Sequence, residues 1–181
     1  MNMRSLMSYG AVALAIGVLV GSWYAGIISF HWPLRQAHSG QDAGSGSQQE
    51  IPLWFWREGK WRSEKVNLVL SSDVCSSVSR TTQAWAQALY EEGLTNKRIG
   101  VEAVLCGADS QTIYISFDRY PFEKEASLFD KWMRIEALLK TIRGLRGSYS
   151  KIHFLVHHKQ LNDYHLDFSN PWPISGYHVA I

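Results

Sequence analysis

A long uncharged stretch near the N-terminus is the feature that most restricts how this chain can fold. No residue between Arg4 and Arg35 carries a formal charge, and the most apolar part extends over residues 6–30. A helix of about 20 such residues is long enough to cross the hydrocarbon core of a membrane. The stretch is longer than the apolar region of a secretory signal peptide, and the bulky Trp23 stands close to its candidate cleavage site. We therefore predict a transmembrane signal anchor at residues 6–30, with a cleaved signal peptide as the alternative.

The charges that flank this segment predict its orientation. Arg4 and the α-amino group stand on one side, and Arg35 stands alone on the other. Because the more positive flank stays in the cytoplasm, residues 1–5 are predicted to be cytoplasmic and the C-terminal part extracytoplasmic or periplasmic, on a single-pass protein of the inner (cytoplasmic) membrane. The lipid bilayer is its first expected partner. Gly17 and Gly21 lie on a stripe of small residues, which indicates either a dimer formed through this helix or a plain lipid-facing helix.

The segment that follows, residues 31–50, is predicted to be a flexible linker. From Gln36 to Glu50 it contains no apolar side chain larger than alanine, so it cannot bury enough surface to offset the entropy of ordering. A chain of this composition has an end-to-end distance on the order of 20 Å. The remainder, residues 51–181, is long enough for one hydrophobic core and too short for two. The net charge of +2, without a stripe of Lys and Arg, argues against a nucleic-acid partner.

Residues 51–181 carry the periodicities of an α+β fold. Strands are expected where apolar and polar residues alternate, and helices where apolar residues recur every three or four positions. Short turns join the strands in pairs, which predicts a mostly antiparallel sheet with two helices on one face, in the order ββ-α-ββ-α-ββ. The predicted strands are residues 53–56, 61–71, 100–106, 111–118, 151–156 and 160–168, and the predicted helices are residues 73–92 and 123–145.

Each predicted helix has an apolar stripe that would face the core. The first stripe ends before Gly93, which is the expected helix stop. The second helix has Glu123 and Glu125 in its first predicted turn, where acidic groups complement the helix dipole. The stripes consist of Val78, Thr82, Trp85 and Leu89 in the first helix, and of Leu128, Trp132, Ile135, Leu139 and Ile142 in the second.

The two cysteines of the chain, Cys75 and Cys106, both fall in the domain that is predicted to be exported. In an oxidising compartment they could form a disulfide that closes a loop of about 30 residues, which the chain-entropy model values at roughly 3–4 kcal/mol. Two small buried apolar side chains are the other interpretation. The sequence leaves both open.

Three tryptophans fall on the first predicted hairpin. Trp54 and Trp56 share one face of their strand because side chains alternate, and Trp61 follows after the turn. If this face is open, it forms a binding platform for glycan strands or for a protein, since indole rings are favoured interface anchors. If a helix covers it, the same residues belong to the core.

Imidazole and carboxylate groups gather near the C-terminus in a pattern that resembles a set of zinc ligands. They are His153, His157, His158, Asp163, His165 and Asp167. Strand parity places His153 and His157 on the face opposite Phe154, so surface histidines are predicted, and no metal or other cofactor is expected. The serines near residues 71–77 are typical of a helix start, and none lies in a nucleophile-elbow motif. We therefore predict no catalytic residue and no enzymatic activity.

Three stretches of the domain resemble the GerMN family, which occurs in spore germination and sporulation proteins and in other exported bacterial proteins. They are the strand at 112–118 with the helix end at 137–143, the strand at 151–156, and the ending at 165–171. The individual residues that carry the resemblance are Thr141 in the helix, and His165, Asp167, Ser169 and Pro171 in the ending.

The chain departs from the family pattern at two places. His157 and His158 stand where the family favours Asp-Gly or Asn-Gly, so this turn requires positive φ at two histidines. Residues 94–99 form a short connection that lacks the family's Gly-Pro. Even so, the resemblance covers roughly the whole of residues 51–181, and it implies a non-catalytic envelope module that supports the assembly of membrane complexes.

Taken together, these features predict a non-enzymatic, single-pass envelope protein. Its domain at residues 51–181 would bind or scaffold an envelope protein partner, in keeping with the resemblance to the GerMN family. The alternative is a cell-wall module that holds peptidoglycan on the tryptophan face while the anchor holds the membrane.

Overall fold

The structure is a computed structural model that describes residues 46–176. The predicted signal anchor at residues 6–30, with Gly17 and Gly21, and most of the predicted linker lie outside the described residues. Within the described part, no helix combines the length and the apolar character that crossing a membrane would require.

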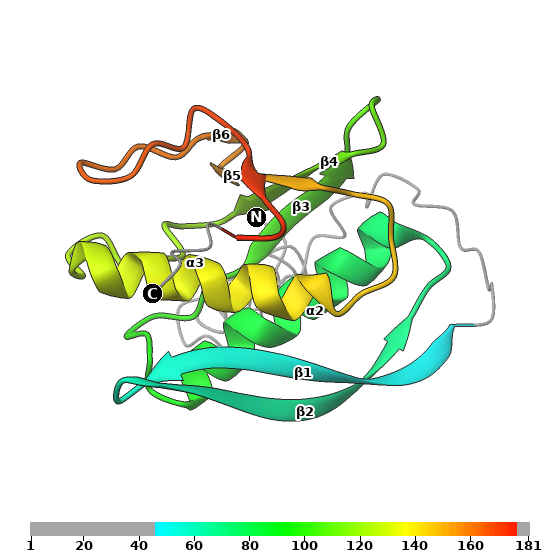
Figure 1. The fold of residues 1–181 in the computed structure, drawn as a ribbon, viewed down its shortest axis with the longest axis horizontal. Helices are drawn as coiled ribbons and strands as arrows, with labels where there is room; N and C mark the ends of the chain where they lie inside the picture. Colours follow the sequence, from blue (N-terminus) through cyan, green and yellow to red (C-terminus); the bar gives the residue numbers. More distant parts are fainter. Residues whose placement is uncertain (1–45, 177–181) are drawn as a thin grey trace, which may run out of the picture. The chain divides into compact units, whose positions relative to one another are not determined.

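The described residues form an α+β domain in the predicted order, with one further short strand at the end. Both helices and all of the longer strands overlap the ranges predicted for them. Figure 1 shows their arrangement. The elements are β1 (Ser47–Arg57), β2 (Lys60–Leu70), α2 (Val74–Glu91), β3 (Val101–Cys106), β4 (Thr112–Phe117), α3 (Leu128–Arg143), β5 (Lys151–Val156), β6 (Lys159–Gln160) and β7 (Trp172–Pro173).

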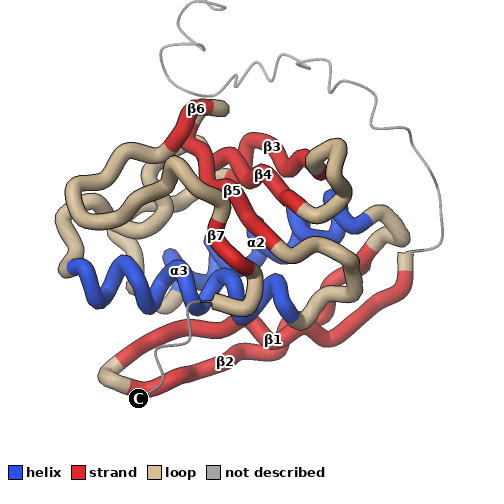
Figure 2. Tube along the Cα trace, turned by 45° about the horizontal axis from the view of Figure 1, so that its top comes forward, coloured by secondary structure: helices blue, strands red, loops and turns tan. Residues whose placement is uncertain are grey.

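The strands form two sheets, and the prediction of one sheet with both helices on one face is wrong in this respect. β1 and β2 pair only with each other, while the second sheet has the order β3-β4-β5-β6 with β7 beside β5. The helices lie between the β1–β2 hairpin and the larger sheet (Figures 1 and 2). Most pairs are antiparallel, but β4 and β5 are parallel because α3 forms the crossover between them.

The β1–β2 hairpin has a two-residue turn at Glu58 and Gly59, with φ of 54° and 71°. Positive φ at both positions is typical of the type I′ turn that fits the twist of a hairpin. β1 begins at Ser47, so the predicted boundary of the linker at residue 50 is wrong. Residues 47–50 pair with residues 67–70 through the backbone while their side chains stay exposed, which composition alone cannot reveal.

Helix α2 confirms its predicted stripe and its predicted stop. Val78, Thr82, Trp85 and Leu89 are all buried, and Gly93 has a φ of +66° just after the helix. Asp73 caps the start, because its carboxylate accepts a hydrogen bond of 2.8 Å from the Ser76 amide.

Helix α3 starts at Leu128, five residues later than predicted (128 − 123). Ser127 is its N-cap and accepts a hydrogen bond of 3.1 Å from the Asp130 amide. Glu123 has a φ of 58° and therefore cannot belong to a right-handed helix. Leu128, expected in the buried stripe, is 47% exposed, whereas Ile135, Leu139 and Ile142 are fully buried as predicted.

The last part of the domain contains less strand than predicted. Of the segment at 160–168, only Gln160 pairs with β5, as the end of the two-residue strand β6. The rest is a loop that returns to the sheet at β7. The turn between β5 and β6 has the predicted positive φ at His157 and His158, 48° and 61°.

Candidate functional site

The face of the β1–β2 hairpin that turns toward α3 carries the three tryptophans singled out in the sequence. Alternation along β1 turns Leu53 and Phe55 into the core, where both are buried, and leaves Trp54 and Trp56 on the opposite face. Trp56 pairs with Trp61 across the turn, so Trp61 shares this face. We call the surface formed by Trp54, Trp56, Trp61, Phe129 and Lys140 the aromatic face.

The aromatic rings of this face are packed edge to face. The ring centroids of Trp56 and Trp61 are 5.1 Å apart with the planes at 72°, and those of Trp56 and Phe129 are 6.0 Å apart at 76°. Such geometry is favourable because the positive edge of one ring meets the negative face of the next. Trp61 is 37% exposed and Phe129 is 57% exposed, while Trp54 and Trp56 are half-buried. The face is thus neither fully open nor covered by a helix.

Lys140 adds a cation to the aromatic face. Its Nζ lies 3.7 Å from the centroid of the Trp54 ring and 4.8 Å from that of Trp61. The ammonium is attracted by the electron-rich ring faces, an interaction worth about 0.5–1 kcal/mol at exposed sites. Lys140 therefore covers part of the ring surface that a flat ligand would stack on.

Two hydrogen bonds from the helices hold the aromatic face in place at Trp54. Its backbone N–H donates to Thr141 Oγ1 of α3 at 2.9 Å, and its carbonyl accepts from Trp85 Nε1 of α2 at 3.0 Å. Thr141 also donates to the Ala137 carbonyl at 2.9 Å, which fixes its hydroxyl. The edge of β1 that faces away from β2 is thus satisfied by the helices at this residue.

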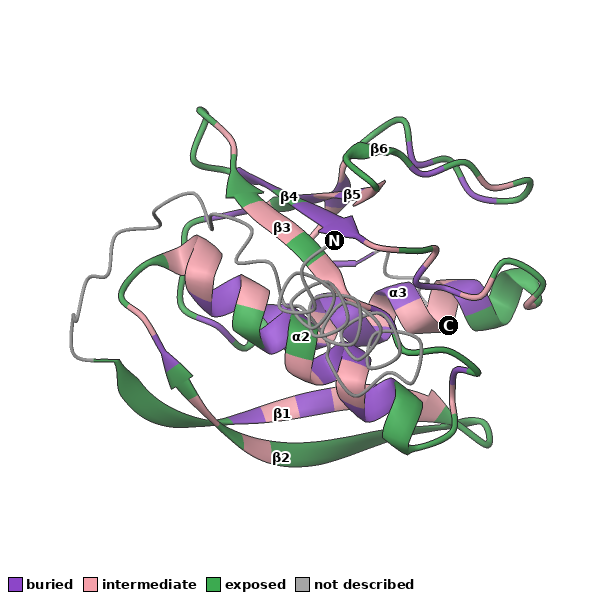
Figure 3. Ribbon diagram, turned by 180° about the vertical axis from the view of Figure 1, so that it is seen from behind, coloured by how far each residue is buried: buried purple, intermediate pink, exposed green. Residues whose placement is uncertain are grey.

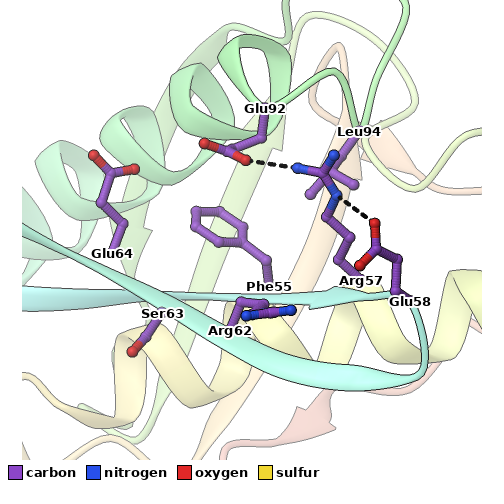
Figure 4. A pocket seen from close by; sticks show the side chains of 8 residues that line it. All are labelled: Phe55, Arg57, Glu58, Arg62, Ser63, Glu64, Glu92 and Leu94. Atoms are coloured by element: carbon purple, nitrogen blue, oxygen red, sulfur yellow. Dashed lines mark hydrogen bonds and ion pairs between the residues drawn. The ribbon is translucent and has the colours of Figure 1, made fainter.

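A surface pocket of about 340 Å³ lies at the tip of the hairpin (Figure 4). Phe55 and Arg57 line it and alternate with Trp54 and Trp56 along β1, which places it on the side opposite the aromatic face. Arg57 pairs there with Glu92 at 2.9 Å and with Glu58 at 3.7 Å. The cations and carboxylates nearly balance, so the pocket presents a mixed polar surface. Its lining residues are Phe55, Arg57, Glu58, Arg62, Ser63, Glu64, Glu92 and Leu94.

A buried ion pair joins α3 to the loop that follows β6. Lys131 Nζ lies 2.7 Å from Asp163 Oδ2, and the two side chains are 1% and 0% exposed. Tyr120 donates a second hydrogen bond of 2.6 Å to the same oxygen. The amides of His165 and Leu166 donate to the other oxygen, Oδ1. The carboxylate is therefore almost fully satisfied, as a buried charge requires.

The pKa values in this network have a clear physical cause. Burial acts to raise the pKa of Asp163, but the hydrogen bonds from Lys131 and Tyr120 outweigh it and lower this pKa to about 2. Burial, together with the hydrogen bond to Asp163, raises the pKa of Tyr120 well above its usual range. Since the side chains of Lys131 and Asp163 are shielded from solvent, the ion pair ties α3 to the loop after β6.

The histidines and carboxylates near the C-terminus do not converge. His157 Nδ1 lies 2.8 Å from Glu102, whereas His165 Nδ1 lies 3.9 Å from the buried Asp163. Between residues 46 and 176, no group of three or more His, Cys, Asp or Glu side chains is placed to hold a metal ion. Asp167 accepts a hydrogen bond of 2.8 Å from the Ser169 amide, which is the role of a turn residue.

Cys75 and Cys106 form a disulfide, with their Cα atoms 6.0 Å apart. It ties the first turn of α2 to the end of β3.

The residues that carry the resemblance to the GerMN family do not gather at one site. Thr141 is buried under Trp54, His165 is exposed, and Pro171 is half-buried. The pattern therefore marks packing and turns, and the aromatic face stays the candidate site.

Sequence reasoning missed Phe129 and Lys140, which complete the aromatic face from α3. They are separated by three helical turns, about 11 residues, which places them on the same side of the helix. That spacing was available as a signal, but nothing in the sequence shows that this side of α3 meets the hairpin. The same holds for Lys131 and Asp163, which are 32 positions apart.

Comparison with known proteins finds similarity to solved structures, and to no family model or curated protein. A crystal structure of a candidate lipoprotein from Clostridium perfringens is 15% identical, with a TM-score of 0.38 over 70% of this chain and 88% of that one. The tandem GerMN domains of the sporulation protein GerM from Bacillus subtilis are 15% identical, with a TM-score of 0.44 over 70% of this chain and 46% of that one. At such values, membership of the GerMN family stays a prediction.

Proposed function

We propose that this protein is a non-enzymatic, single-pass envelope protein whose domain binds or scaffolds another envelope protein through the aromatic face. The observation that carries the proposal is the exposure of Trp61 and Phe129 around the half-buried Trp56. Aromatic anchors of this kind dominate the binding energy of protein interfaces, because they bring a large apolar area at a small cost in side-chain entropy.

The packing of the rings favours a protein partner over a glycan. A sugar ring would need a flat indole face to stack on, but Trp56 and Trp61 stand at 72° to each other. Lys140 also lies over Trp54 and Trp61, within 5 Å of both ring centroids. A protein side chain can fit such an uneven surface, and a carboxylate on it could pair with Lys140. Peptidoglycan is therefore the less favoured ligand.

The predicted location of the domain outside the cytoplasm supports an envelope partner. The uncharged segment at residues 6–30 is long enough for an anchor. The disulfide between Cys75 and Cys106 agrees with an oxidising compartment, since such bonds rarely persist in the cytoplasm. A domain held near the membrane in this way would meet membrane proteins at high effective concentration.

Cross-linking in native membranes tests the proposal. We expect the full-length chain to capture a partner. The double variant Trp61→Ala/Phe129→Ala should capture at least tenfold less of this partner. Tyr164→Ala is the matched control, because Tyr164 is an aromatic residue that is 90% exposed and lies outside the aromatic face. Equal capture by the double variant and the parent would refute the proposed site.

Co-sedimentation with purified peptidoglycan separates the two candidate ligands. We expect the full-length chain to stay in the supernatant. If the chain pellets, and if Trp61→Ala abolishes pelleting, the cell-wall module is the correct function and the protein partner is not.

A further inference from the structure

The two long edges of the β1–β2 hairpin differ in their hydrogen bonding. On the edge formed by β1, the Trp54 N–H donates to the Thr141 side chain and the Trp54 carbonyl accepts from the Trp85 side chain. The backbone of Trp54 therefore points away from β2, so Trp54 and Ser63 form a non-hydrogen-bonded pair. By the same geometry, the N–H and the carbonyl of Ser63 point away from β1, toward the free edge of β2.

Alternation extends this free edge along β2. The residues whose backbone groups point outward are every second one, namely Trp61, Ser63, Lys65 and Asn67. Beyond them, Arg80 donates to the carbonyl of Val69 and closes that end of the edge. β2 has no second strand beside it among the described residues, and it runs along the outside of the domain (Figure 3). The open stretch is about 20 Å long.

Cations surround this open edge. β2 contains Lys60, Arg62 and Lys65 against the single acid Glu64. Lys65 pairs with Glu50 at 2.8 Å, but Lys60 and Arg62 form no ion pair with any described residue. On the aromatic face, Lys140 lies over the ring of Trp61. Pairing with β2 of a second copy would bring like charges together, whereas an acidic strand would neutralise them.

We infer that β2 is a docking edge for an extended acidic segment of the partner, which adds to the hairpin as a third strand. The inference rests on the proposed function, because the side chains of Trp61 and Ser63 lie on the aromatic face. Strand addition supplies affinity through backbone hydrogen bonds and specificity through alternate side chains. Acidic side chains on the face of the added strand that carries Trp61 would meet Lys140. The other face would meet Lys60 and Arg62, of which Arg62 stands beside the carboxylates of Glu58, Glu64 and Glu92.

A peptide that alternates glutamate with valine over eight residues is the probe, and its analogue with lysine in place of glutamate is the control. We expect the full-length chain to bind the acidic peptide at least tenfold more tightly than the basic one. Binding should slow the hydrogen exchange of the amides of Trp61, Ser63 and Lys65. No binding of the acidic peptide at millimolar concentration, or equal binding of both, overturns the inference.

Substitution at Ser63 tests the backbone role directly. Ser63→Pro removes an N–H that points to the free edge and leaves the β1–β2 ladder intact, so affinity should fall at least tenfold, whereas Ser63→Ala should stay within twofold. If the proline variant has an altered melting temperature, the variant Lys60→Glu/Arg62→Glu serves instead. Its affinity for the acidic peptide should also fall at least tenfold. Unchanged affinity in these variants contradicts strand addition.

Two further outcomes distinguish this inference from the proposed function. If Ser63→Pro still captures the partner in native membranes while Trp61→Ala/Phe129→Ala does not, the aromatic face binds the partner without strand addition. If the edge amides are protected in the free chain, and more so at higher protein concentration, a second copy occupies the edge and the acidic segment does not.

Discussion

The domain contains two aromatic clusters that are built from similar rings and placed in opposite environments. Phe122, Phe154 and Phe168 meet in the core, with centroids 5.3–6.3 Å apart, and each is at most 2% exposed. The rings of the aromatic face keep similar spacings where the hairpin meets α3, and there Trp61 and Phe129 reach solvent. The contrast teaches that the first cluster is enclosed on all sides, whereas the second leaves Trp61 and Phe129 partly exposed, where a partner can reach them.

The largest effect expected from this comparison concerns the buried cluster. Phe154→Ala removes a side chain that contacts both other phenylalanines and leaves a cavity, so it should lower the free energy of unfolding by about 4 kcal/mol. Trp61→Ala removes an even larger side chain from a more exposed position, where it loses the contacts with Trp56 and Lys140, and should cost about 1–2 kcal/mol. Urea denaturation of both variants measures the difference. Equal losses would mean that the aromatic face is part of the structural core.

The next effect concerns charge, in the buried pair of Lys131 and Asp163. Asp163→Asn leaves the Lys131 cation buried without its counter-ion, so at neutral pH it should cost about 3 kcal/mol. Glu92→Gln is the control, because its pair with Arg57 is about half exposed and contributes at most about 1 kcal/mol.

The stability that the pair of Lys131 and Asp163 contributes should decrease as the solution becomes acidic. The pKa of Asp163 is depressed to about 2 in the folded chain, below its usual value near 3.8. The stability that the ionised carboxylate contributes is therefore complete above about pH 4 and is lost as the pH falls toward 2. The difference in melting temperature between the parent and Asp163→Asn should therefore become smaller over this interval, which thermal melts from pH 5 to pH 2 can measure. A difference that stays constant would show that the carboxylate is not ionised in the folded chain.

Periodicity and turn chemistry predicted both helices and the longer strands. Asp73 and Gly93 bracket α2 where a cap and a stop were expected, whereas the strand predicted at 160–168 is mostly a loop. The start of α3 was misplaced because Glu123 and Glu125 suit a first helical turn, yet the backbone of Glu123 lies in the left-handed region. Here the acidic composition favoured a helix that the tertiary structure does not form.

Long-range arrangement was harder to predict for a physical reason. Strand periodicity does not record which strands are neighbours, so the parallel pairing of β4 with β5 and the separate hairpin sheet were missed. The sequence did not indicate that Lys131 is buried, because only the position of Asp163 in the folded chain explains this burial. In the same way, the tryptophans were identified as a candidate face, but their partners on α3 depend on how the helix packs.

The smallest effect concerns the hydrogen bond between Thr141 and Trp54, which links α3 to the strand that carries the aromatic face. Thr141→Val leaves the Trp54 N–H without its acceptor and should cost about 1–2 kcal/mol, whereas Thr141→Ser keeps the hydroxyl. Thr82→Val is the matched control in α2, because the buried Thr82 hydroxyl has no hydrogen-bond partner among the described residues, and its loss should be neutral or stabilising. Chemical denaturation compares the three. If Thr141→Val proves as neutral as Thr82→Val, packing alone fixes β1 against α3, and the aromatic face keeps its position without this hydrogen bond.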